Sequence, residues 1–166
     1  MKNILLFLLL NATAFTVLHA QNAIPTDKQK KDIYELIDKY SEAREKQDTI
    51  LLKNILTTGV DQLVSTGEWR NGIAASVKGM LSSSANSPGT RTLTVDKLRM
   101  LSSTSAIVDC RYEITNPDNT ARKMWSTFMV ISEQGVWKIT AIRNMLLNVL
   151  RFIVQTLVFQ ETYFIK

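Results

Sequence analysis

The chain has 166 residues, 45% of them hydrophobic, and a formal net charge of +5, which suits one globular domain with a single core. Its basic residues are scattered rather than clustered with aromatic side chains, so the composition disfavours nucleic-acid binding. Cys110 is the only cysteine and His19, in the leader described next, is the only histidine, so an internal disulfide, histidine-based catalysis and the usual zinc sites are excluded, and we expect no metal and no cofactor.

Residues 1–20 have the pattern of a secretory signal peptide. Lys2 precedes an apolar run that reaches Leu18, and the small residue Ala20 stands before the polar Gln21. The run is too short and too often interrupted by polar residues for a comfortable membrane span. We therefore expect cleavage near Ala20/Gln21 and a periplasmic or secreted product. An uncleaved anchor is the alternative.

Two helices are predicted in the first part of the mature chain. Apolar residues recur at three- and four-residue spacing over residues 26–46, with charged residues on the other face, which indicates an amphipathic helix. Asp48 can accept hydrogen bonds from free backbone amides and so begins a second, short helix that ends before Gly59.

The next segment is mixed. A short strand is predicted at residues 61–66, followed by a turn-rich stretch and a third helix around residues 73–81. The serine-rich residues 82–89 end in Pro88 and Gly89, which predicts a loop at a sheet edge or pocket mouth.

After Arg91 the apolar period changes from about 3.6 to 2, which indicates a sheet. The apolar parity flips between Val95 and Leu98, as a β-bulge in a curved strand would produce. Short connections give an antiparallel meander with strands at residues 91–101, 104–115, 121–132 and 136–145. The predicted fold is α+β, with a curved four- to five-stranded antiparallel sheet wrapped on three N-terminal helices.

The strand at residues 104–115 has one apolar and one charged face. Cys110 lies on the apolar face, where we expect it to behave as a small core hydrophobe rather than a reactive thiol. Asp109, Arg111 and Glu113 alternate on the other face. We interpret them as a solvated or dimer-facing stripe rather than an acid–base set, since cross-strand charge pairs are common.

Three strings carry a family resemblance: Tyr40 followed by Asp48, residues 63–67 (LVSTG), and residues 135–145 (GVWKITAIRNM). With the order of elements they resemble the nuclear-transport-factor-2-like, or SnoaL-like, superfamily, and most of all its SgcJ/EcaC-type members, over residues 32–145. The resemblance implies a cone-shaped domain at residues 21–145 with an internal pocket, often paired into a homodimer. Relatives include isomerases, cyclases, dehydratases and binding domains, so fold alone does not choose a function.

The resemblance also bears on catalysis. It places Tyr40 where the family's ketosteroid isomerases have a helix-one tyrosine, but the general-base position falls at Val64, which cannot take a proton. Asp61 or Glu68 could serve as the base only if the local register differs. An enzyme of ketosteroid-isomerase or polyketide-cyclase type is therefore the less favoured reading.

Helix face and strand parity turn Tyr40, Tyr112 and Arg143 inward as candidate pocket residues, and Trp69 and Trp125 are candidate apolar walls. The two tyrosines are otherwise core aromatics, Trp69 otherwise holds its loop, and Arg143 otherwise belongs to the surface or a dimer interface. We favour an exported, homodimeric domain that binds a small apolar molecule in an apolar pocket, without demonstrable catalytic machinery. The alternatives are a cofactor-free isomerase, cyclase or dehydratase, and a protein-interaction module.

Residues 146–166 form an apolar extension beyond the resemblance. As a helix this extension has a polar stripe and could close the pocket, join a dimer or contact a membrane surface, the last being the least favoured. Its β-branched and aromatic residues could equally extend the last strand. A reading-frame artefact without an evolved role is the third interpretation.

Overall fold

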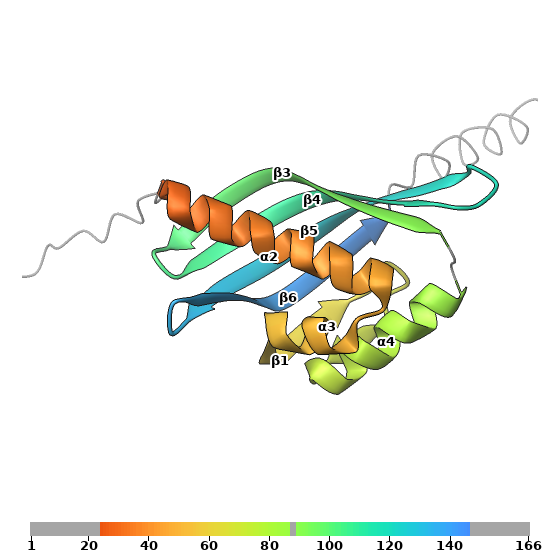
Figure 1. Ribbon diagram of the computed structural model, residues 1–166, viewed down its shortest axis with the longest axis horizontal. Coiled ribbons are helices and arrows are strands. Elements are labelled where there is room, and N and C mark those ends of the chain that lie inside the picture. The colour runs from red at the N-terminus through yellow and green to blue at the C-terminus, as the bar shows by residue number, and fades with distance from the viewer. Residues whose placement is uncertain (1–23, 87–88, 147–166) are drawn as a thin grey trace, which may run out of the picture.

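The computed structural model describes residues 24–86 and 89–146. The predicted signal peptide and residues 147–166 of the predicted extension lie outside the described residues. No helix within the described ranges is long and apolar enough to cross a membrane. The elements in chain order are α2 (Asp27–Lys46), α3 (Thr49–Ile55), β1 (Leu56–Leu63), β2 (Trp69–Asn71), α4 (Gly72–Asn86), β3 (Thr90–Ser102), β4 (Ser105–Thr115), β5 (Ala121–Glu133) and β6 (Val136–Leu146) (Figure 1).

The strands form one six-stranded sheet in the order β2-β1-β6-β5-β4-β3. The predicted α+β fold and the antiparallel meander β3 to β6 are confirmed, but the sheet has six strands rather than four to five, because both the predicted short strand β1 and the unpredicted β2 join it beside β6. β1 begins at Leu56, five residues before the predicted Asp61, and pairs in parallel with β6. β2 pairs antiparallel with β1 across the stretch predicted to be a turn. These two strands bring a distant part of the chain beside β6.

Irregular pairing bends the sheet. The β3–β4 register shifts between Val95 and Lys97, which confirms the bulge predicted from the parity of the apolar residues. A second shift lies between Met129 and Val130, where β5 pairs with β6, and was not predicted. An extra residue in one strand bends it and increases its twist, so the sheet curves around the helices instead of lying flat.

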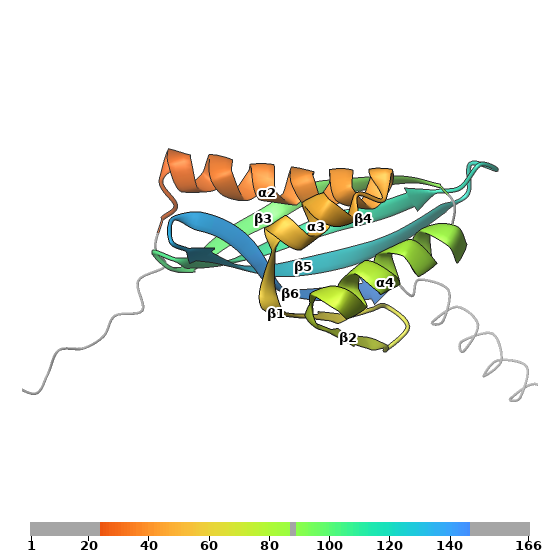
Figure 2. The same ribbon diagram turned by 60° about the horizontal axis from the view of Figure 1, so that its bottom comes forward.

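Helix α2 lies along one face of the long strands (Figure 2). Its predicted apolar side packs against the sheet, with Ile33, Ile37 and Ala43 completely buried. The Tyr40 ring meets Phe128 of β5 edge-on, with ring centroids 5.1 Å apart. This helix and the inner faces of β4, β5 and β6 form the main core together with residues of α3, β1, α4 and β3, and the large apolar area that they bury is the main stabilising term.

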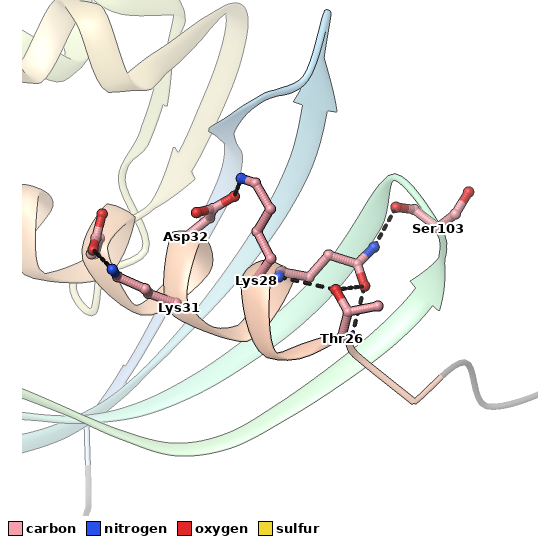
Figure 3. Close-up of polar contacts among 7 residues, drawn as sticks. Thr26, Lys28, Lys31, Asp32 and Ser103 are labelled. Carbon is pink, nitrogen blue, oxygen red and sulfur yellow. Dashed lines mark hydrogen bonds and ion pairs between the residues drawn. The ribbon is translucent and has the colours of Figure 1, made fainter.

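The start of α2 is fixed by side chains (Figure 3). Thr26 caps the helix by accepting a hydrogen bond from the Gln29 amide at 3.2 Å, while the Gln29 side chain accepts one from the Thr26 amide at 2.9 Å. Gln29 Nε2 also donates to the carbonyl oxygen of Ser103, at 2.9 Å, in the turn between β3 and β4. The helix end is therefore tied to the far end of the sheet, beyond what a capping box alone provides.

The serine-rich segment predicted as a loop is helical as far as Asn86, so the loop prediction for residues 82–86 was wrong. Ser82 is exposed, whereas Ser83 and Ser84 face the protein. Ser83 Oγ donates to the Met80 carbonyl oxygen at 3.1 Å and accepts a hydrogen bond from Arg44 at 2.6 Å, and Ser84 is buried. A serine hydroxyl that finds a partner, as that of Ser83 does, is tolerated within a helix, while the Ser84 hydroxyl has no hydrogen-bond partner among the described residues.

The charged side chains of β4 lie on the outer face of the sheet, opposite the core. Thr127 donates to Asp109 at 2.7 Å, Arg111 pairs with Asp96 of β3, and Lys123 of β5 pairs with Glu113. These are cross-strand pairs between neighbouring strands, which agrees with their interpretation as a surface stripe rather than a catalytic set.

Candidate functional site

A cavity of about 530 Å³ lies between α2, α4, the loop joining β1 to β2, and the inner faces of β4 and β6. Its size is typical of pockets for small organic ligands. The walls come from every element except α3, so the curvature of the sheet and the placement of α4 on β1 and β2 create the space together. The described residues have no cluster of His, Cys, Asp or Glu side chains that could hold a metal ion.

Three of the five predicted pocket residues line this cavity: Tyr40, Trp69 and Tyr112. Trp125 does not. On β5 the buried Ser126 and Phe128 face inward, so Trp125 faces outward, beside Asp109 in a shallow groove on the outer face. Sequence parity could not assign Trp125 correctly, because both faces of β5 carry large apolar side chains.

Arg143 also lies outside the cavity, because the predicted parity of β6 is reversed. The register shift opposite Met129 and Val130 turns Ile142 and Asn144 inward instead. Arg143 forms a bidentate pair with the carboxylate of Asp61 on β1, at 2.7 and 3.1 Å, and stacks over the ring of Trp69 at 4.8 Å. Its role is to join β1 to β6 and to support Trp69 from behind.

The main feature that sequence reasoning missed is a set of buried arginines. Arg44, Arg70 and Arg91 line the cavity, and each is only 8% exposed. Lys78 and Arg122 add two more basic side chains to the walls. A signal was present for Arg44, which follows Tyr40 by four residues and therefore shares the buried face of α2. The lining is thus more polar than the apolar pocket predicted.

Arg70 is neutralised within the protein. Its Nε and Nη2 donate to the two carboxylate oxygens of Glu68, at 3.0 and 3.3 Å. The hydrogen bond from Arg70 and its positive charge hold the pKa of Glu68 below its ordinary value. The guanidinium lies against Gly79 of α4, where even a single methyl group would collide with it. The bidentate geometry therefore depends on a glycine in the middle of α4.

Arg44 has no such counter-ion. Its Nη2 donates to the Ser83 hydroxyl at 2.6 Å, its Nε is buried without a hydrogen-bond partner, and no carboxylate among the described residues pairs with it. The hydroxyl groups of Tyr40 and Tyr112 lie close to its charge. Removing a guanidinium from water without a compensating anion costs several kcal/mol. The site therefore holds a buried positive charge that no anion among the described residues compensates.

The two tyrosines add hydroxyl groups beside this charge. Burial raises the pKa of Tyr40, against the opposing effect of the Arg44 charge, so the phenol stays protonated at neutral pH and can donate a hydrogen bond. The Tyr112 hydroxyl is buried beside Arg44 yet makes no hydrogen bond of good geometry with any described residue. The Tyr40 hydroxyl interacts with the Gln62 side chain but keeps its own proton to donate, whereas the Tyr112 hydroxyl is left for a bound molecule to pair with.

The cavity is poorly equipped for proton transfer. Val64 lines it, as the resemblance implied, and Asp61 is outside and paired with Arg143. Among the described residues that line the cavity, Glu68 is the one carboxylate, and its pairing with Arg70 keeps it ionised and weakly basic. A general base needs a pKa raised toward the working pH. The arrangement is therefore better suited to holding a ligand than to moving protons.

Solved structures show a clear likeness to the whole fold. A domain of unknown function with a cystatin-like fold from Nostoc punctiforme is 15% identical, with a TM-score of 0.71, 82% of this chain covered and 88% of that one. An NTF-2 like protein of unknown function from Shewanella oneidensis is 20% identical, with a TM-score of 0.58 and coverage of 70% and 98%. A putative calcium/calmodulin dependent protein kinase II association domain from Xanthomonas campestris is 15% identical, with a TM-score of 0.62 and coverage of 81% and 100%.

No protein-family model and no curated protein matches the chain. The element order, the curved open sheet and these structural likenesses nevertheless define its class. The chain has the NTF2-like fold, also called cystatin-like, which confirms the fold that the resemblance of its sequence implied. The narrower resemblance to SgcJ/EcaC-type members stays a prediction.

Proposed function

We propose that this chain is an exported small-molecule-binding domain whose ligand occupies the cavity between α2, α4 and the sheet. The observation that carries the proposal is the cavity itself. It has the volume of a ligand pocket, and the buried Arg44 Nε and Tyr112 hydroxyl at its wall have no hydrogen-bond partner among the described residues. Buried polar groups are nearly always paired in native proteins, so their lack of partners favours an occupant that supplies them. Val64, Ala75 and Ile114 give the same cavity an apolar part.

Export and dimerisation belong to the same proposal. The signal-peptide pattern of residues 1–20 supports export to the periplasm or medium. The outer sheet face supports a homodimer, because Met129 and Met145 are 40% and 55% exposed there beside the half-buried Trp125. Exposed apolar side chains grouped on one face are typical of interaction surfaces.

Native mass spectrometry of the chain purified from its own periplasm or medium tests the ligand proposal. We expect the wild-type protein to carry an added mass. The variant Ala75→Phe should lose it, because Ala75 lines the cavity and a phenyl ring fills part of the space. Ala74→Phe is the matched control, since Ala74 is the exposed neighbour on α4. An added mass retained by Ala75→Phe, or no added mass in the wild type, would contradict the proposal.

A cofactor-free isomerase, cyclase or dehydratase is the second candidate. The observation in its favour is the protonated Tyr40 hydroxyl beside Arg44, two donors that could stabilise an oxyanion formed from a carbonyl group. It would need a base within the cavity, and Glu68 is the carboxylate available there among the described residues. Turnover of a carbonyl substrate that Glu68→Gln abolishes, while ligand retention is unchanged, would favour this candidate over simple binding.

A further inference from the structure

The chemistry of the ligand can be read from the charges around it, and this step rests on the proposed function. Arg44 extends from the last turn of α2 into the cavity wall, where only 8% of its surface is exposed. Among the described residues, its guanidinium donates a hydrogen bond to the neutral hydroxyl of Ser83. The Nε–H group, which forms one side of the guanidinium fork together with Nη2, is left unbonded. A carboxylate is the ligand group whose two oxygens match a guanidinium edge.

The surroundings of Arg44 favour one negative charge rather than a neutral polar group. Tyr40 and Tyr112 both place hydroxyl groups near the guanidinium. They can donate to an oxyanion, but as neutral phenols they do not compensate the positive charge. A neutral ligand would therefore satisfy hydrogen bonds and leave the buried charge uncompensated, whereas an anion does both.

The other basic side chains around the cavity do not require a second negative charge on the ligand. Arg70 is paired with Glu68. Arg91 donates to the carbonyl oxygens of Gly89 and Ser83, at 2.9 and 3.4 Å, and the Glu45 carboxylate lies beside it, accepting a hydrogen bond from the Arg91 backbone amide at 3.1 Å. Lys78 and Arg122 are exposed residues of the wall, where they raise the positive potential that draws an anion toward the cavity.

We propose that the ligand is an organic monocarboxylate whose carboxylate binds Arg44, Tyr40 and Tyr112, and whose apolar body lies against Val64, Ala75 and Ile114. A phosphate group has the same attraction to guanidinium but brings close to two charges at neutral pH. The buried Arg44 guanidinium, which has no carboxylate beside it among the described residues, matches a single charge better. The apolar wall also requires a carbon body that inorganic phosphate lacks.

Isothermal titration calorimetry with 4-phenylbutanoate, its amide 4-phenylbutanamide and inorganic phosphate tests this assignment. We expect the acid to bind at least about tenfold more tightly than the amide, as is usual for a hydrogen-bonded charge pair, and phosphate to bind more weakly than the acid. Arg44→Met should reduce acid binding by about tenfold or more and leave amide binding nearly unchanged. Lys46→Met is the matched control, because it removes an equal charge from the exposed side of the same helix end.

A second pair of variants keeps the test valid if Arg44→Met fails to fold. Tyr112→Phe removes one hydroxyl group without changing volume and should weaken acid binding several-fold. Tyr34→Phe is its control, since Tyr34 packs with Lys30 and does not line the cavity. Equal binding of acid and amide, no binding of the acid at millimolar concentration, unchanged acid binding in Arg44→Met and Tyr112→Phe, or tighter binding of phosphate would each overturn the carboxylate assignment.

Failure of the proposed binding function and failure of the carboxylate assignment give different results. A natural ligand that mass spectrometry finds equally in wild type and Arg44→Met would leave the binding function standing and remove the anion from it.

Discussion

At the residue scale, Cys110 shows what a single buried group contributes. The thiol lies on the inner face of β4, in the main core, and is completely buried. Burial raises its pKa to about 12, with a smaller contribution from the carboxylates of Asp109 and Asp96. The thiolate is the reactive form of cysteine, so the protein keeps this side chain inert. Its predicted role as a core hydrophobe agrees with this placement.

The raised pKa predicts a pH effect on stability. The unfolded thiol titrates near its ordinary value of 9.0, while the folded thiol stays protonated to about 12. Between these values the folded state binds more protons than the unfolded state, so the free energy of unfolding falls as pH rises. The loss should approach about 1.4 kcal/mol per pH unit above the unfolded pKa.

Urea unfolding of wild type and Cys110→Ala at about pH 8 and pH 10 measures this effect. The variant loses packing at both pH values because its side chain is smaller. The wild type should lose about 1 kcal/mol more than the variant between the two conditions. Lysine and tyrosine titrations are common to both proteins and cancel in the comparison. Equal losses would show that the Cys110 thiol does not titrate differently in the folded state.

At the element scale, the two bulges show which features sequence reveals. In β3 the apolar residues change parity between Val95 and Leu98, so the irregularity is visible in the pattern alone. In β6 the sequence pattern shows no break in the alternation, because Ala141 and Ile142 are both apolar, and in the structure both are buried. Two adjacent buried residues in a half-exposed strand were the only sign. The wrong prediction that Arg143 faces the pocket follows from this ambiguity.

The contact of α4 with β2 gives the second prediction. Gly79 lies in the middle of α4, where alanine would ordinarily stabilise a helix by about 0.5–1 kcal/mol. A methyl group at this position would collide with the Arg70 guanidinium, which is the flexible end of a side chain and can move. We therefore expect Gly79→Ala to change the free energy of unfolding by less than about 1 kcal/mol while displacing Arg70 from Glu68.

The displacement can be followed directly through the Glu68 carboxylate. Arg70 holds the pKa of Glu68 below its ordinary value, so this pKa should rise in Gly79→Ala when the side-chain carboxyl is titrated by NMR. Gly59→Ala is the control, because nothing lies within 4 Å of the added methyl group on β1. A Glu68 titration that is the same in Gly79→Ala and wild type would show that the ion pair does not need the glycine.

At the scale of the whole molecule, the sequence predicted the layers better than the site. Period changes locate the helices and the four long strands, and the family resemblance implies the cone. The parallel pairing of β1 with β6 joins segments about 80 residues apart, and no local pattern encodes it. The cavity depends on that pairing, since Gln62 and Arg70 reach it from β1 and β2. The charged lining of the cavity therefore could not be predicted from the sequence and is visible only in the tertiary structure.

The proposed homodimer is also a property of the whole molecule. If two copies meet through their outer sheet faces, Met129 lies in the buried interface, and Met129→Lys should place a charge there without touching the cavity. Sedimentation velocity should then show a dimer for the wild type and a monomer for the variant. Ile50→Lys, which replaces a side chain that is 71% exposed on α3, should remain dimeric.

A ligand-binding measurement on the same variant tests whether the dimer surface and the pocket are independent. Because Met129 and the cavity lie on opposite faces of the sheet, monomeric Met129→Lys should retain the added mass seen for wild type in native mass spectrometry. A charge buried in an apolar interface is costly enough to dissociate a dimer of moderate affinity. If the wild type sediments as a monomer, or if Ile50→Lys dissociates the dimer and Met129→Lys does not, the outer sheet face is not the interface.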